Sequence, residues 1–197
     1  LGSRGRGEVD KRQSIDGRIA FTDAPQGPLI AKLNKYDGDG AGADWWILNM
    51  LRAVSDGDII GAGTMNAESD YTAHVFSQQL EDARVAAGME PVPWNIISSL
   101  DATDIPFDHV LFKTKEVPVM ISTSAAGVPV IREKMKEDYY LVGPVKDISE
   151  VTGEMIESMK ANRNKVLAVS YKHIRAHSTL THIVFSLRRL KKTLCGG

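Results

Sequence analysis

Short β-branched segments alternate with amphipathic segments along most of this 197-residue chain, and this alternation is the feature that most restricts its fold. The segments predicted as strands begin near Ile59, Trp94, Val117, Tyr139 and Lys165. The segments predicted as helices cover about residues 44–57, 75–87 and 148–160, with Asp44 capping the first and Asp147 and Glu150 forming a capping box at the third. Strands that alternate with helices require crossover connections. The sequence therefore predicts an α/β fold with a mostly parallel central sheet flanked by helices.

The composition is that of one soluble globular domain, with 43% hydrophobic and 25% charged residues. No apolar run approaches the roughly 18 residues that a membrane span needs, and no signal peptide is recognisable. The single cysteine, Cys195, rules out a disulfide within the chain. These features favour a cytoplasmic location and argue against a membrane role.

The charge is distributed unevenly although the formal net charge is only −1. From residue 170 onwards there are six basic residues and no acid, which leaves 18 basic residues against all 25 acids in the rest of the chain. The acidic body argues against nucleic acid as the main ligand.

The sequence predicts three parts: a disordered lead over residues 1–11, a domain over 12–169 and an atypical basic tail over 170–197. The tail has helical spacing that would suit a membrane surface or a partner, but its abrupt start favours foreign or out-of-frame sequence.

A strand that leads into two glycines and a hydroxyl group, Asp58-Ile59-Ile60-Gly61-Ala62-Gly63-Thr64, is the first candidate for a ligand site. Glycine lets the backbone approach a bulky ligand, and the N–H groups of such a turn can hold a phosphate. The alternative is a tight turn without a ligand. The dinucleotide fingerprint G-x-G-x-x-G is not completed, because Asn66 stands at its last glycine position.

Two further groups of polar residues are candidates for the same site. Ser122, Thr123 and Ser124 follow a predicted strand, and Ser14 lies just before a predicted turn centred on Asp16 and Gly17. Because parallel sheets bind ligands at the carboxyl ends of their strands, the hydroxyl run and Gly61–Thr64 are expected at one edge. The simpler interpretation is that these residues form turns and caps. No metal site is predicted, since the spaced histidines near the C-terminus have no carboxylate or cysteine beside them.

Three motifs together resemble a known family. They are Gln13-Ser14-Ile15-Asp16-Gly17-Arg18-Ile19-Ala20, then Asp44-Trp45-Trp46-Ile47-Leu48-Asn49-Met50-Leu51-Arg52-Ala53, then Asp58 to Glu68 with its glycine pair. Their order and spacing are similar to those of the pyrimidine reductase domain of riboflavin biosynthesis, which has a dihydrofolate-reductase-like fold. The resemblance covers about residues 12–169.

The resemblance implies hydride transfer from NADPH to the ribosylamino side chain of a phosphorylated aminouracil, or to a related small substrate. It implies that Gly61, Ala62, Gly63 and Thr64 lie against the cofactor and that Ser122, Thr123 and Ser124 lie near its adenosine phosphate. It also implies that Ser14 and Asp16 face the substrate, with Asp16 orienting the ribose or relaying a proton. Family members commonly pair through their sheets, so a homodimer is a candidate assembly.

The C-terminal part differs from the family pattern. After Val169 the family continues with a glycine-glycine turn, a helix and further strands, whereas this chain continues with its basic tail. The C-terminal part is therefore predicted to be incomplete or atypical. The alternative to an active reductase is a truncated, non-catalytic nucleotide-binding module with the same fold.

Overall fold

A computed structural model describes residues 23, 40–145, 150 and 152–171. The predicted substrate residues Ser14 and Asp16, the lead and all but the first two residues of the tail lie outside the described residues. The chain divides into two compact units, Leu1–Leu48 and Asn49–Gly197. Every described strand belongs to the second unit.

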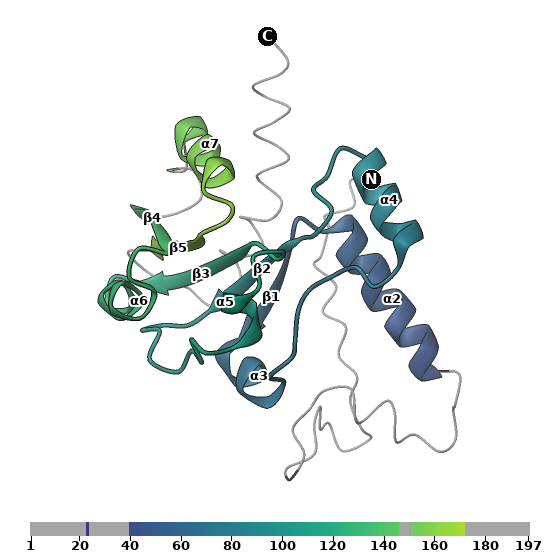
Figure 1. The fold of residues 1–197 in the computed structure, drawn as a ribbon, viewed down its shortest axis with the longest axis horizontal. Coiled ribbons are helices and arrows are strands. Elements are labelled where there is room, and N and C mark those ends of the chain that lie inside the picture. The colour runs from purple at the N-terminus through teal and green to yellow at the C-terminus, as the bar shows by residue number, and fades with distance from the viewer. Residues whose placement is uncertain (1–22, 24–39, 146–149, 151, 172–197) are drawn as a thin grey trace, which may run out of the picture. The chain divides into compact units, whose positions relative to one another are not determined.

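The described elements alternate between helix and strand, as the sequence predicted. In chain order they are α2 (Gly40–Val54), β1 (Gly57–Gly61), α3 (Ala62–Ala67), α4 (Gln78–Ala86), β2 (Trp94–Ser98), α5 (Val110–Lys113), β3 (Val119–Ser124), α6 (Gly127–Met135), β4 (Tyr139–Val145), α7 (Gly153–Ala161) and β5 (Val166–Tyr171). The strands form one sheet in the order β1-β2-β3-β5-β4, and every pairing is parallel (Figure 1). The predicted α/β fold with a parallel sheet and flanking helices is confirmed.

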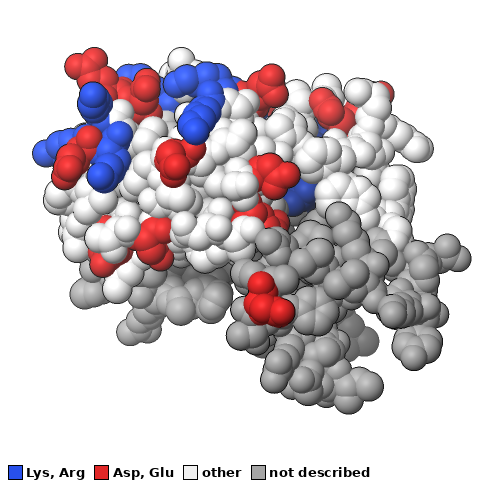
Figure 2. All heavy atoms as spheres, turned by 60° about the horizontal axis from the view of Figure 1, so that its bottom comes forward, with Lys and Arg blue, Asp and Glu red and all other residues white. Residues whose placement is uncertain are grey.

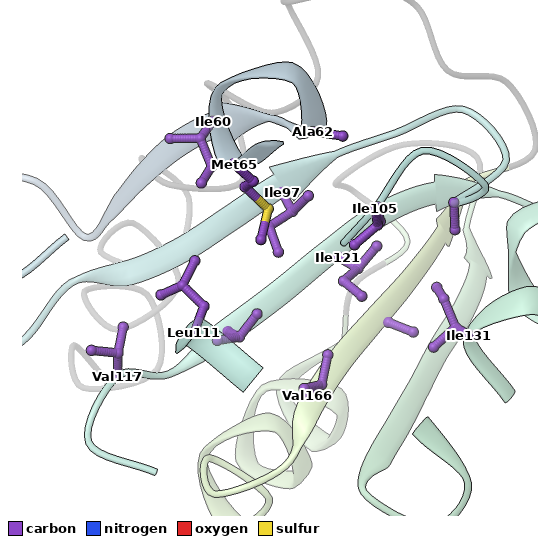
Figure 3. Packing of buried hydrophobic residues seen from close by; sticks show 13 residues of the cluster. Ile60, Ala62, Met65, Ile97, Ile105, Leu111, Val117, Ile121, Ile131 and Val166 are labelled. Atoms are coloured by element: carbon purple, nitrogen blue, oxygen red, sulfur yellow. The ribbon is translucent and has the colours of Figure 1, made fainter. Parts of the chain in front are cut away.

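The middle strands of the sheet are buried on both faces, which is why they are mostly apolar. On one face, side chains of the middle strands pack against Met65 of α3, Leu111 of α5 and Ile131 of α6 (Figure 3). On the other face, alternate residues of the same strands pack against Met159 of α7. Leu167 and Ala168 of β5 belong to opposite faces and are both fully buried.

Two predicted helix starts are wrong. Asp44 does not cap a helix, because α2 begins four residues earlier, at Gly40. The third predicted helix begins at Gly153, where Thr152 accepts a hydrogen bond from the Met155 N–H at 3.3 Å and so takes the capping role expected of Asp147 and Glu150. Glu150 precedes that cap, and residue 147 lies outside the described residues. Threonine is, like aspartate, a preferred N-cap residue, because its side-chain oxygen accepts from the free N–H groups of a first turn.

Two strands extend further than predicted. β4 continues through Gly143, which was expected to end it, to Val145, with a shift of register against β5 after Val142. β5 continues two residues past the predicted boundary at residue 169, and its Ser170 pairs with Thr123 of β3. The sheet therefore includes the first two residues of the segment that was predicted as tail.

Candidate functional site

The carboxyl edge of the sheet brings together the ends of β1, β2 and β3. Gly61 pairs with Ser98 of β2, and Ser98 pairs with Ser122 of β3. Because neighbouring strands lie about 4.8 Å apart, Gly61 and Ser122 are about 10 Å from each other along this row. The expectation that the glycines and the hydroxyl run share one edge of the sheet is confirmed.

The residues Gly61, Ala62, Gly63 and Thr64, called the glycine segment below, do not form the turn that the sequence suggested. β1 passes directly into α3, so Gly61 is the last residue of the strand and the N-cap of the helix, with φ −89° and ψ 158°. Ala62 and Met65 turn into the core and hold α3 against the sheet. Gly61, Gly63 and Thr64 are exposed.

Neither glycine of this segment is required by the part of the fold that the structure describes. The backbone angles of Gly61 are open to any residue, since its φ is negative. In the part of the chain that the structure describes, no atom lies within 4 Å of a Cβ built at Gly61 or at Gly63. Gly63 also lies inside a helix, where glycine is less favourable than alanine by about 0.5–1 kcal/mol. Contacts among the described residues do not explain these two glycines, and they leave space open beside the backbone.

The hydroxyl run lies within β3 rather than after it. Ser122 and Thr123 are buried, and Thr123 Oγ1 donates to the Leu100 carbonyl at 3.1 Å. Ser124 Oγ accepts from the Ala126 N–H at 3.1 Å and so shapes the turn into α6. These two hydroxyl groups have partners within the protein. The predicted role of Ser122, Thr123 and Ser124 beside an adenosine phosphate stays a prediction.

The loop after β2 completes this edge and is held by side-chain hydrogen bonds. Ser99 Oγ donates to Asp104 Oδ1 at 2.5 Å and accepts from the Ala102 N–H at 3.0 Å. Asp101 is fully exposed and accepts from both the hydroxyl and the N–H of Thr103, which lowers the pKa of its carboxyl below the usual 3.8. The loop thus presents a carboxylate that is ionised at neutral pH.

A buried ionic network supports the start of β1. The Arg52 side chain is only 4% exposed; its Nε donates to Asp58 Oδ2 at 3.0 Å and its Nη2 to the Tyr71 hydroxyl at 3.0 Å. Tyr71 in turn donates to Asp58 Oδ2 at 2.7 Å. Burial raises the pKa of Tyr71 above its usual 10.0, and the Asp58 charge adds to the shift. No pairing of Arg52 with Asp58 or Tyr71 was predicted from the sequence, where Arg52 belongs to the helix motif and Asp58 to the glycine motif.

Other described features lie away from the glycine segment. A cavity of about 20 Å³, enough for one water molecule, is lined among others by Val117, Val119 and Val166 near the amino ends of β3 and β5. It is too small for a substrate.

No helix among the described residues is long and apolar enough to cross a membrane. Within the same residues, no three His, Cys, Asp or Glu side chains come together as they would around a metal ion.

Figure 2 shows one face of the molecule, on which Lys and Arg side chains lie among Asp and Glu side chains instead of forming one continuous basic patch. A nucleic-acid backbone is bound through many adjacent cations. This face therefore offers no such surface.

No protein-family model matches the chain, and no curated protein matches its sequence. Among solved structures, the chain is similar to a pyrimidine reductase-like protein from Corynebacterium diphtheriae, with 18% sequence identity and a TM-score of 0.48. The match covers 80% of this chain and 62% of that one, so the chain spans about three fifths of the length of the structure it matches. At this level of similarity neither the family nor the activity of that protein transfers to this chain.

Proposed function

We propose that this chain is a reductase that binds NADPH along the carboxyl edge of its sheet, with the cofactor against the glycine segment. The substrate is a phosphorylated aminouracil whose ribosylamino side chain accepts the hydride, or a related small molecule. The proposal rests on three sequence motifs in the order and spacing of the pyrimidine reductases, and on the unexplained glycines. The observation that carries it is the open space beside Gly61 and Gly63.

The open glycines fit a cofactor that approaches the backbone. A parallel sheet binds its ligands at the carboxyl ends of its strands, and the glycine segment lies there. The exposed Thr64 side chain offers a hydroxyl group at the same place. A glycine inside a helix, as at position 63, costs helix stability and is best explained by an external group that needs the volume of the missing side chain.

The chemistry needs few reactive side chains. NADPH supplies the hydride when it is bound. The protein then has to hold the cofactor and the substrate and to transfer one proton. We assign the holding of the cofactor to the glycine segment. Ser14 and Asp16 lie outside the described residues; we assign to them the binding of the substrate, and to Asp16 the relay of a proton.

The decisive test is to add a methyl group where the fold tolerates it and a ligand would not. Gly63→Ala should raise the free energy of unfolding by about 0.5–1 kcal/mol, because alanine is the better helix residue. The same methyl group should weaken NADPH binding about ten-fold, since overpacking a contact costs about 1–3 kcal/mol. Binding is measured by titration of nicotinamide fluorescence, with NADH for comparison, and stability by thermal unfolding.

Gly42→Ala is the matched control. Gly42 is also a helical glycine, and no described atom lies within 4 Å of a Cβ built there. It should gain similar helix stability with no change in NADPH affinity. Equal NADPH affinity of the Gly63→Ala variant and the wild type would contradict the proposed site.

Turnover separates the reductase from a binding module. Asp16→Asn should abolish reduction while NADPH binding is largely kept, because its assigned role is at the substrate. A wild-type chain that binds NADPH but reduces no aminouracil substrate would support the truncated, non-catalytic module instead.

A further inference from the structure

We propose that Asn66 is a positioning residue that ties α3 to the loop after β2 and thereby holds the glycine segment in the conformation that binds the cofactor. This inference rests on the proposed function. Asn66 stands at the position where the dinucleotide fingerprint would have its third glycine, and the proposed cofactor site gives it no contact with the ligand. Its side chain instead connects two parts of the same edge of the sheet.

Both donors of the Asn66 amide group are used. Nδ2 donates to the Ala62 carbonyl at 2.9 Å, one helical turn back, and to the Asp104 carbonyl in the loop after β2 at 3.0 Å. An amide nitrogen carries two hydrogens, so these bonds account for its full donor capacity. The first bond lies within α3, whereas the second crosses 38 residues of sequence. The second bond is therefore the one that fixes α3 relative to the loop.

The loop that Asn66 contacts is itself bound to β3. Its Leu100 carbonyl accepts from Thr123 Oγ1 at 3.1 Å and from the Ser124 N–H at 3.1 Å. Ala102 in the same loop has φ 61°, a left-handed conformation that alanine rarely adopts. A loop in this conformation must be held by its surroundings. Hydrogen bonds thus run from α3 through the loop to β3 and join the ends of three neighbouring strands.

Removal of the Asn66 side chain should affect only α3 and the loop after β2. α3 has only six residues, and its buried anchors Ala62 and Met65 fix one side of it. Without Asn66, the exposed side that carries Gly63 and Thr64 would lose its only described side-chain bond to the loop after β2, while the core contacts stay in place. Loss of Asn66 should therefore loosen the glycine segment and weaken cofactor binding without unfolding the domain.

The test combines hydrogen exchange with cofactor titration on the full chain. In Asn66→Ala, amide exchange within residues 99–104 should be about five-fold faster, the loss expected for one net hydrogen bond. The NADPH dissociation constant should rise by a similar factor of about five, because a looser site has to be ordered on binding. Asn66→Asp, which keeps the shape, removes both donors and places a carboxylate beside two carbonyl oxygens, should accelerate exchange and weaken binding at least as much.

Asn162→Ala is the matched control, because Asn162, the C-cap of α7, donates from Nδ2 to the Ser158 carbonyl at 2.8 Å, also one helical turn back. It should change neither the exchange of the loop nor the NADPH affinity. Unchanged exchange in residues 99–104 of both Asn66 variants would overturn the inference, and so would faster exchange with unchanged affinity. A wild-type chain that binds no NADPH would refute the proposed function and with it the positioning of a cofactor, while the exchange result would still show whether Asn66 holds the loop.

Discussion

Replacement of Gly127 by alanine should destabilise the fold, in contrast to the same change at Gly63. Gly127 is the first residue of α6 and is buried against the loop after β2. A Cβ built there would lie 2.0 Å from Thr123 Oγ1, 3.0 Å from Thr123 Cβ and 3.1 Å from the carbonyl carbon of Asp101. Ordinary contacts begin at 3.4 Å. The Thr123 hydroxyl must therefore move away from the added methyl group. The backbone at residue 101 cannot easily move as well, because it is less free to rotate than a side chain.

The magnitude follows from three contributions. Overpacking of a buried contact costs about 1–3 kcal/mol. Rotation of the Thr123 hydroxyl breaks its bond to the Leu100 carbonyl, at about 1 kcal/mol, although that carbonyl keeps the Ser124 N–H. The better helix propensity of alanine returns about 0.5–1 kcal/mol. The net loss is about 2 kcal/mol, which corresponds to a melting temperature lower by about 4–8 °C for a chain of this size.

Thermal and urea unfolding followed by circular dichroism will measure this loss. Thr123→Ala removes the atom that lies nearest to the added methyl group, so the double variant Gly127→Ala with Thr123→Ala should be less destabilised than the sum of the two single changes. A coupling of about 1 kcal/mol is expected for residues in contact. Gly127→Ala with wild-type stability, or strict additivity of the two changes, would refute the packing at the start of α6.

Two further predictions concern buried polar groups of the second unit. The Arg84 side chain is 3% exposed and donates to the last carbonyls of α2, among them those of Arg52 and Ala53, so Arg84→Met should cost about 2–3 kcal/mol in urea unfolding. Arg84→Lys keeps the charge but carries its donors on one nitrogen, so it should recover only part of this loss; full recovery would contradict the role of the guanidinium geometry. Tyr71→Phe should cost about 1–2 kcal/mol at pH 7, because Asp58 loses a hydroxyl donor. Since the folded pKa of Tyr71 is raised above the unfolded value of 10.0, its contribution is complete below pH 10 and declines above it, so the stability difference between variant and wild type should narrow as the pH rises beyond 10. A difference that widens there would show that the tyrosine is not buried as described.

The sequence predicted the middle strands well because they are buried on both faces. Val166–Tyr171 and Val119–Ser124 are runs of apolar and β-branched residues, and such runs need no partner to be recognised. The helix α6, of nine residues, was not predicted. The shortest helices, α3 and α5, were also missed. They have six and four residues, too few for a helical period to emerge, and they form because the core supplies places for Met65 and Leu111.

The polar contacts were less predictable because their partners are distant in sequence. Arg52 was expected on a helix with an apolar inner face, yet Arg52 is buried and Val54 is 67% exposed. The helix turns this way because Asp58 and Tyr71 pair with the arginine, and neither pairing is visible in a helical pattern. Asn66 was noted only as a departure from a fingerprint. Its link to Asp104 depends on a loop that follows the next strand.

The sequence by itself determined the α/β class, the parallel sheet and the meeting of Gly61 with Ser122 at one edge, because periodicity and chain order decide where parallel strands end. Only the tertiary structure decided which glycines serve the fold. Gly127 has neighbouring atoms where a side chain would be, whereas Gly61 and Gly63 have none among the described residues. The sequence shows a glycine in each case and does not distinguish the two situations. The reason is physical: whether a position requires glycine depends on which atoms lie beside its Cα, and those atoms belong to parts of the chain far away in sequence.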